Sequence, residues 1–327
     1  MITRRRVILA FAAGALAAPL ASFPQQQQRV YRIGILDPLS QIEVEANYNA
    51  FMQGLRELGY DEGKNILIER RFGEGHFDRL PALAADLVKQ KVEVILAPNT
   101  VASRAARQAT DTIPIVFSIV GDPVGIGLAA SLARPGGNVT GISDVSADLS
   151  AKRLQLLKEV SPRSSRVAVF TSNEPQAIHQ FAEVQRAAKF LHMMVLSVQV
   201  QNRSDFAENS ALLRKWGADS MYVVSTVANF LNRRLLAEFV AMVRLPAIYP
   251  HSRYTEAGGL ISYGANHPAL FRRAAAYVDK ILKGSKPAEL PIEQPTVFEL
   301  IVNMKTAKAL GIKIPGSILV QATKVIE

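Results

Sequence analysis

The 327-residue sequence contains no cysteine, and this absence removes several kinds of chemistry from consideration. Without a thiol, the chain cannot form a disulfide framework, use a thiolate nucleophile or bind a metal through sulfur. It also cannot carry a lipid on an N-terminal cysteine. We therefore expect any exported form to be free in its compartment.

Motifs for metals, cofactors and catalysis are missing as well. The five histidines are dispersed, with no pair at the spacing of one helical turn, which argues against a zinc site. The sequence has neither a G-x-x-x-x-G-K-[ST] phosphate loop nor a G-x-S-x-G nucleophile elbow. Residues 125–130 weakly resemble a dinucleotide fingerprint, but residues 121–124 separate them from the preceding strand. We expect no cofactor, no metal and no enzymatic activity; an enzyme using a cleft is the less favoured alternative.

Acidic residues are the scarcer charged class, with 28 Asp and Glu against 38 Lys and Arg, a net charge of +10 and a pI near 9.8. Such a balance raises nucleic acid as a partner. The basic residues are scattered, however, and no aromatic residues alternate with them as a base-stacking platform requires. We interpret the charge as a solvated basic surface and expect no nucleic-acid partner.

Long apolar runs are absent apart from one near the N-terminus. Arginines at 4–6 precede the apolar stretch 7–18, which is shorter than the ~20 residues of a membrane-spanning helix. This order predicts an export signal peptide over residues 1–24, cleaved between Ala18 and Pro24. The Thr-Arg-Arg start is similar to a twin-arginine signal, and an uncleaved amphipathic or anchoring N-terminus is the alternative.

The rest of the chain has the composition and pattern of a folded α/β protein. Hydrophobic residues make up 49% and charged residues 20%, and the length allows two ordinary domains. Short apolar strands separated by helices of about 10 to 15 residues are typical of βαβ units and a parallel sheet covered on both faces. Right-handed crossovers then give a doubly wound layer. In a first run we predict strands at 32–36, 65–70, 92–97 and 114–118, and helices at 42–58, 78–90, 101–109 and 124–132.

The alternation begins again after a strand at 138–142. No Pro/Gly/Ser linker separates the two runs, so we expect two α/β lobes connected directly by a strand near residues 141–145. In the second run we predict strands at 166–170, 194–200, 220–224, 246–249, 259–263 and 298–303, and helices at 149–160, 174–191, 203–216, 229–243, 266–284 and 305–310.

Small polar residues occupy the loops that follow the predicted strands in both lobes. Ligands of such folds bind at the carboxyl ends of the strands, where helix N-termini attract carboxylates and phosphates. Any one of these residues is also an ordinary helix N-cap. Their recurrence in both lobes is what predicts a shared cleft. The loops lie at 37–40, 98–100, 121–123, 171–173, 225–226, 251–253 and 264–266.

Several segments in combination resemble the substrate-binding proteins of ABC transporters, of the type that binds tryptophan and other aromatic amino acids. The resemblance extends from about Tyr31 to Glu327. It rests on residues 113–117, 121–125, 132–141, 245–249, 256–260, 262–264 and 299–312.

This resemblance implies a type I periplasmic-binding-protein fold, with two doubly wound parallel-sheet lobes joined by three crossover strands. The crossovers are expected near residues 141–145, 264–267 and 291–296. The expected domains are the signal peptide at 1–24, a first lobe of 30–143 plus 266–290, and a second lobe of 144–265 plus 291–327.

The resemblance also implies a set of ligand-binding residues, taken from the loops that match the family's ligand loops. In the first lobe these are Leu39, Ser40, Asn99, Thr100, Gly121, Asp122 and Pro123, and in the second lobe they are Asn173, Thr226, Asn229, Ser252 and Arg253.

One departure from the family pattern concerns the ligand. Many relatives carry an aspartate after the strand at 220–224, where it can neutralise a ligand amino group, but this chain has Ser225 and Thr226 there. Asp122 is the best replacement and Glu174 a second, whereas Arg253 would favour an anionic solute.

An amino acid or a related carboxylate is the expected ligand class. Its carboxylate would bind at the helix that Asn99 and Thr100 open, since helix N-termini stabilise anions. The alternative is that Asn99, Thr100 and Asp122 only cap their helices.

These features together predict a periplasmic solute-binding protein that delivers a small molecule to an ABC permease by closing two lobes around it. We expect a monomer that contacts the membrane only through the permease. The alternative is the ligand-sensing protein of a signalling system on the same fold, because a fold does not decide function.

Overall fold

The computed structural model describes residues 29–327, so the predicted signal peptide at 1–24 lies outside the described residues. The described chain forms two sheets, of strand order β2-β1-β3-β4-β5 and β12-β11-β10-β9-β8-β6-β7. The paired strands are parallel except β10 with β11. This arrangement confirms the predicted α/β class with two mostly parallel sheets. None of the helices within residues 29–327 is long and apolar enough to cross a membrane.

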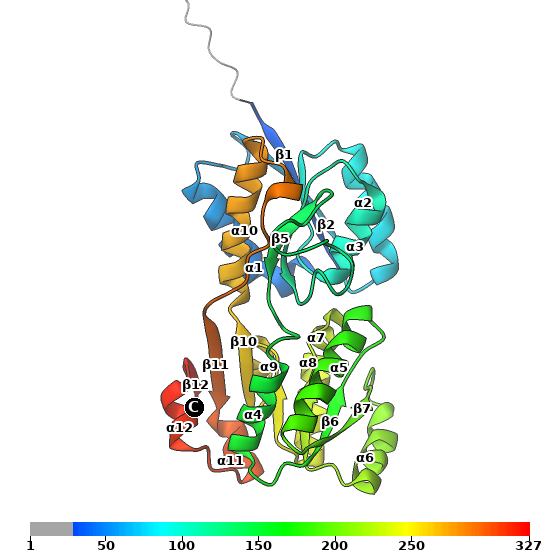
Figure 1. Cartoon of the computed structure of the whole chain (residues 1–327), viewed down its shortest axis with the longest axis vertical. Helices are drawn as coiled ribbons and strands as arrows, with labels where there is room; N and C mark the ends of the chain where they lie inside the picture. Colours follow the sequence, from blue (N-terminus) through cyan, green and yellow to red (C-terminus); the bar gives the residue numbers. More distant parts are fainter. Residues whose placement is uncertain (1–28) are drawn as a thin grey trace, which may run out of the picture.

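The five-stranded sheet and the helices packed on it form what we call the first lobe, at the top of Figure 1. Alternate strand residues face opposite sides, so Ile33 and Ile35 pack with α1 and α10, whereas Leu36 packs with α2 and α3. The elements are β1 (Tyr31–Asp37), α1 (Gln41–Glu57), β2 (Ile66–Phe72), α2 (Leu80–Lys89), β3 (Val94–Leu96), α3 (Thr100–Ala109), β4 (Ile115–Val120), β5 (Val139–Ser143) and α10 (His267–Leu282).

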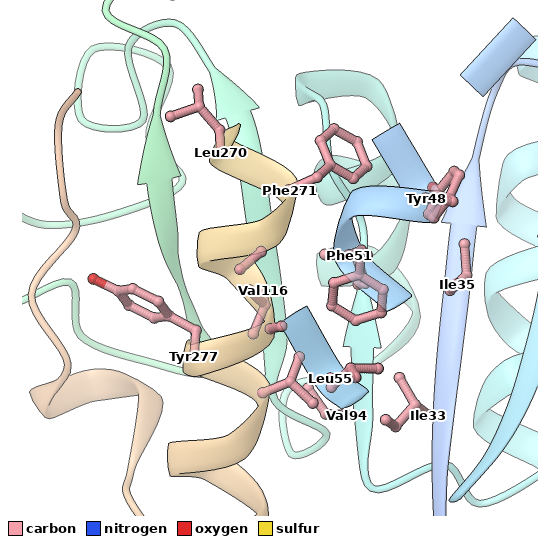
Figure 2. Packing of buried hydrophobic residues seen from close by; sticks show 14 of the residues in the cluster. Ile33, Ile35, Tyr48, Phe51, Leu55, Val94, Val116, Leu270, Phe271 and Tyr277 are labelled. Carbon is pink, nitrogen blue, oxygen red and sulfur yellow. The ribbon is translucent and has the colours of Figure 1, made fainter. Parts of the chain in front are cut away.

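Helices α1 and α10 lie side by side over the first sheet, as Figure 2 shows. Phe51 and Leu55 of α1 and Phe271 of α10 are buried between the helices and the strands. The ring of Tyr48 meets that of Phe271 edge to face at 5.3 Å between centroids. Two segments far apart in the sequence therefore share one core.

The seven-stranded sheet and its helices form the second lobe, at the bottom of Figure 1. Val167 and Val169 pack on one side with α4 and α5, and Phe170 packs on the other side with α8 and α9. The elements are α4 (Ser150–Val160), β6 (Arg166–Phe170), α5 (Pro175–Phe190), β7 (Met194–Val198), α6 (Asp205–Trp216), β8 (Ser220–Val223), α7 (Val227–Leu231), α8 (Arg233–Val243), β9 (Ala247–Tyr249), α9 (Ser252–Glu256), β10 (Ile261–Ala265), β11 (Phe298–Asn303), α11 (Met304–Leu310), α12 (Gly316–Gln321) and β12 (Lys324–Ile326).

The chain passes between the lobes at three places, all visible in Figure 1. It passes once after β5, once between β10 and α10, and once between the short 3-10 helix at Pro287–Glu289 and β11. The fully buried guanidinium of Arg153 ties two of these passages, because it donates to the carbonyls of Ser146 at 2.8 Å and Tyr263 at 2.7 Å. The exact domain limits stay a prediction.

The helix predicted at 124–132 is wrong: this segment is a series of turns. Gly127 has a left-handed φ of 72°, and the Gly125 N–H donates to Asp122 Oδ1 at 2.8 Å. Two glycines weaken a helix, and a left-handed residue ends it. The predicted helix at 229–243 is two helices, α7 and α8, and the short elements α9, α12 and β12 had not been predicted.

Candidate functional site

A cavity of about 520 Å³ lies between the two lobes, within the size range of small-molecule sites. It lies where the carboxyl ends of β1, β3 and β4 face the loops that follow β8 and β9. The residues that line it are Asp37, Leu39, Val44, Ala46, Asn47, Asn99, Thr100, Ile119, Gly121, Asp144, Gln176, Gln180, Ser225, Thr226, Val227, Phe230, His251, Ser252, Arg253, Glu256, Ala265, Asn266, His267, Pro268, Phe271, Glu299, Ile301 and Lys324.

The N-terminus of α3 forms one part of the first-lobe wall. Asn99 caps this helix, because its Oδ1 accepts the Ala102 N–H at 3.1 Å, and Thr100 is the first helical residue. The first N–H groups of a helix have no partner within it, and the helix dipole adds positive potential there. This part of the wall therefore suits the carboxylate of a ligand.

Asp37, the last residue of β1, is a buried carboxyl group on the same wall, with only 1% of its surface exposed. Its Oδ1 accepts the Leu39 N–H at 3.0 Å, and its Oδ2 accepts the Tyr48 O–H at 2.8 Å. Burial raises the pKa of Asp37 from 3.8 to about 6, in spite of these two hydrogen bonds. The group is still mainly ionised at pH 7.5.

Asp144 is the second buried carboxyl group of the cavity, and it follows β5. It accepts the Ser146 N–H and O–H at 3.1 and 2.8 Å, and His267 Nε2 lies 3.6 Å away. Burial alone would raise the pKa of Asp144, but His267 and Ser146 outweigh it and hold this pKa below its usual range. Asp144 thus has partners within the protein.

The second-lobe wall is held by hydrogen bonds between side chains and loops. Gln180 of α5 forms two bonds of 2.8 Å with the backbone of Ser225, donating to its carbonyl and accepting its N–H. Thr226 caps α7 by accepting the Asn229 N–H at 3.1 Å. The Asn229 side chain donates to the carbonyls of Phe170 and Val224, both at 3.1 Å. These bonds fix the loop after β8 without a ligand.

Glu174 closes the same network from the loop after β6. Its carboxylate accepts the N–H groups of Val227 and Ala228 at the start of α7, at 3.4 and 2.8 Å, and the side-chain amide of Gln176. Burial nevertheless raises the pKa of Glu174. Glu174 is not among the residues that line the cavity, and its oxygens already have partners.

Aromatic and basic groups form the remaining part of the second-lobe wall. The rings of Phe230 and His251 lie 5.5 Å apart between centroids. Burial, together with the charges of His267 and nearby arginines, holds the pKa of His251 well below its usual range, so this imidazole is neutral at pH 7. Arg253 lines the cavity and ion-pairs with Glu256 at 3.7 Å.

Contacts on both sides of the cavity connect the lobes. Arg233 of α8 lies 3.3 Å from Glu43 of α1, and Arg253 Nη1 donates to the Glu43 carbonyl at 3.5 Å. On the segment after β4, Asp122 Oδ2 lies 2.7 Å from His179 Nε2 of α5. The lobes therefore meet around the cavity in this arrangement.

The structure places the sequence-predicted ligand residues in two groups. The cavity brings together Leu39, Asn99, Thr100, Gly121, Thr226, Ser252 and Arg253. It does not include Ser40, which caps α1, or Pro123, or Asn173, which accepts a bond from Gln199, or Asn229, whose side chain is used within its own lobe.

Asp122 also lies outside the cavity lining, next to the lining residue Gly121. One of its oxygens accepts the Gly125 N–H and the other contacts His179. Glu174 likewise lies outside the lining, and its oxygens accept the N–H groups at the start of α7. Both carboxylates therefore have structural contacts.

The sequence reasoning missed Asp37, Asp144, Gln176, Gln180 and His267. Asp37 lies in the loop at 37–40, in which the sequence predicts Leu39 and Ser40 as ligand residues. A single acidic residue at the end of an apolar strand was the available signal for it. Within residues 29–327, no group of three or more His, Asp or Glu side chains is arranged to hold a metal ion.

Comparisons with known proteins agree with this geometry. A family model described as ABC transporter substrate binding protein matches residues 32–326. The chain is similar to a curated protein of Clostridioides difficile (strain R20291) named Tyrosine-binding protein, with 27% identity over 284 residues, 86% of this chain and 81% of that protein.

Solved structures show the same fold. A conserved domain protein from Vibrio cholerae has a TM-score of 0.85 and 25% identity, covering 91% of this chain and 100% of that chain. The ABC domain of a Streptococcus pneumoniae protein, solved in complex with L-Trp, has a TM-score of 0.83 and 24% identity over the same shares. These likenesses confirm the expected type I periplasmic-binding-protein fold.

Proposed function

The chain belongs to the family of ABC transporter substrate-binding proteins, and we propose that it captures a small solute between its lobes and delivers it to an ABC importer. The observation that carries this proposal is the cavity between the lobes, lined by residues of both. Lobes formed by 30–143 plus 266–290 and by 144–265 plus 291–327 would close about the three passages of the chain. The importer would recognise the closed form, which the ligand must bind better than the open form.

The contacts between the lobes support closure as the mechanism. The Arg233–Glu43 pair and the Asp122–His179 pair each join one residue of the first lobe to one of the second. Partly exposed pairs such as Asp122–His179 contribute about 0–1 kcal/mol, and burying a pair such as Arg233–Glu43 costs desolvation that offsets much of its attraction. They are therefore weak enough for the ligand to decide between the open and closed forms.

An amino acid or a related carboxylate is the solute that we propose, with an aromatic side chain as the leading choice. The N-terminus of α3 offers N–H groups to a carboxylate. Phe230 and His251 offer ring faces to an apolar or aromatic group. The similar Clostridioides difficile protein is named for tyrosine, which supports this class.

Export to the periplasm through the twin-arginine route, followed by removal of residues 1–24, is the localisation that we propose. The protein would act there as a monomer that contacts the membrane only through the permease. We propose no nucleic-acid partner and no catalysis. Family membership and the dispersed basic residues support this view.

Thermal unfolding of the purified protein in the presence of a panel of amino acids, organic acids, amines and sugars tests the proposal. A ligand at 100 times its Kd adds about 2.7 kcal/mol to the free energy of unfolding, which raises Tm by several degrees. A panel in which no solute raises Tm contradicts solute capture. A solute that binds but does not make the protein stimulate the ATPase of a reconstituted transporter favours the sensor alternative.

A further inference from the structure

The carboxyl groups that line the cavity differ in whether the protein supplies them with a partner of its own. Asp144 has His267, and Glu256 has Arg253 at 3.7 Å and Lys324 at 3.5 Å. Glu299 accepts the side-chain amide of Asn266 at 2.6 Å. Within residues 29–327, none of the ion pairs includes Asp37.

Asp37 is nevertheless the most deeply buried carboxyl group of the set. It is 1% exposed, and each of its oxygens accepts only one hydrogen bond, from Leu39 and from Tyr48. An ionised carboxylate has about four acceptor sites, so about half of its capacity is unused. Buried charges in proteins are as a rule paired, because an unpaired one is costly to desolvate.

We propose that Asp37 binds the cationic group of the solute, such as an α-ammonium group, and that the ligand is the missing partner of this carboxylate. This inference rests on the proposed function and assigns the solute a positively charged amine.

The other parts of the wall agree with this assignment. The loop after β8, where this chain has Ser225 and Thr226, is closed by Gln180, and it offers no carboxylate. The α3 N-terminus lies on the same wall as Asp37, since β1 and β3 are neighbours in the sheet. A solute with both an ammonium and a carboxylate group would find one partner for each.

The test compares amines with the same molecules lacking the amino group. The probes are L-tyrosine with 3-(4-hydroxyphenyl)propionate and L-tryptophan with 3-(indol-3-yl)propionate, followed by any amine that raises Tm in the panel with its des-amino analogue. Calorimetric titration gives Kd for the wild type, for Asp37→Asn and for Tyr48→Phe. Asparagine keeps the shape of the side chain, removes the charge and replaces one acceptor oxygen with an N–H donor group, whereas Tyr48→Phe removes one hydrogen bond and keeps the charge.

We expect the wild type to prefer the amine about 100-fold or more, which is the cost of leaving one member of a buried charge pair alone. Asp37→Asn should reduce this preference below about tenfold and leave the Kd of the des-amino analogue unchanged, whereas Tyr48→Phe should keep the preference. An unchanged preference in Asp37→Asn, or wild-type ligands that carry no cationic group, would overturn the assignment and leave solute capture intact. Absence of any ligand would overturn the proposed function itself, and the assignment with it.

Discussion

Gln180 in the second-lobe wall and Asp37 in the first-lobe wall differ in how far the protein supplies their polar groups with partners. In the second lobe, the side-chain amide of Gln180 bonds to both the N–H and the carbonyl of Ser225. Outside the cavity lining, the carboxylate of Glu174 accepts two N–H groups at the start of α7. In the first lobe, Asp37 is buried with two hydrogen bonds and no cation. The loop after β8 in the second lobe is therefore held in place before a ligand binds, whereas Asp37 in the first lobe carries a buried charge that lowers the stability of the protein.

This difference assigns different tasks to the lobes. A wall that is rigid before binding loses little entropy when the ligand arrives, which favours affinity. A buried charge without a partner lowers the stability of the ligand-free protein and is relieved by a ligand of opposite charge. The first lobe would then mainly determine which charge the solute must carry, and the second lobe would determine the shape of the solute that fits.

The largest effect should come from separating the two walls with a bulky side chain. A Cβ at Gly121 would lie in ordinary contact, 3.5 Å from Asp144 Oδ1 and Ser146 Cβ, so alanine fits, whereas a phenyl ring at this cavity-lining position would occupy space meant for the solute. Gly121→Phe should weaken solute binding more than about 100-fold, and Gly121→Ala should bind within about threefold of the wild type. Calorimetric titration of both variants checks this, and tight binding by Gly121→Phe would place the ligand elsewhere.

Removing the charge of Asp37 should stabilise the ligand-free protein. The folded-state pKa of about 6 lies above the ordinary 3.8, so the folded state resists ionisation, and above pH 6 the charged group opposes folding by up to about 3 kcal/mol. Asp37→Asn should therefore raise the free energy of unfolding at pH 7.5 by up to this amount, less about 1 kcal/mol for the hydrogen bond that the amide nitrogen cannot accept.

The stability gained by Asp37→Asn should depend on pH, because the pKa of Asp37 is higher in the folded state than in the unfolded state. As pH falls from 6 toward 4, Asp37 takes up a proton in the folded wild type, and the difference between variant and wild type should disappear. Urea unfolding at pH 7.5 and at pH 4 measures it. If Asp37 served only to hold Leu39 and Tyr48, Asp37→Asn would destabilise the protein at both pH values.

Breaking the clamp of the second lobe, by which we mean the two hydrogen bonds between Gln180 and the backbone of Ser225, should lower the free energy of unfolding. Gln180→Met keeps the length of the side chain and leaves the N–H and carbonyl of Ser225 without their partners, so we expect a loss of about 2–4 kcal/mol in the free energy of unfolding. Gln185→Met, at an exposed position of the same helix, should change it by no more than about 0.5 kcal/mol. Equal effects of the two substitutions would show that the clamp does not hold this wall.

The smallest effect is expected at Asp122, which contacts Gly125 and His179 outside the cavity lining. Asp122→Asn should lower the free energy of unfolding by about 1 kcal/mol or less. The Kd for the solute should change less than about threefold, which calorimetric titration at pH 7.5 measures. A loss of affinity beyond about tenfold would return Asp122 to the role of countercharge.

The sequence predicted most of the architecture because strands and helices leave a local pattern. The apolar run at 92–97 and the helical spacing at 42–58 needed no tertiary information. A helix was wrongly predicted at 124–132 because the apolar residues there have helical spacing. The left-handed backbone of Gly127, which ends a helix, arises only in the turn that this segment forms. The β12 strand at Lys324–Ile326 exists only by pairing with β11.

The site could be predicted only in part. Asn99 and Thr226 are both helix caps and cavity residues, and the sequence cannot separate these roles. Whether Asp37 has a cationic partner depends on which side chains from distant parts of the sequence lie near it in the folded chain, and the sequence alone does not show this. The pairing of Asp144 with His267 depends likewise on segments that meet only in the folded chain.

Capture of a solute between two closing lobes is the central claim, and the distance between the lobes tests it most directly. Since the chain has no cysteine, spin labels can be placed at Gln108→Cys on α3 and Lys189→Cys on α5, both exposed and on different lobes. Pulsed electron–electron double resonance then gives the distribution of distances between the two spin labels, with and without a solute that raises Tm. A shorter and narrower distribution with the solute is the predicted result, and an unchanged distribution at saturating solute would contradict the claim.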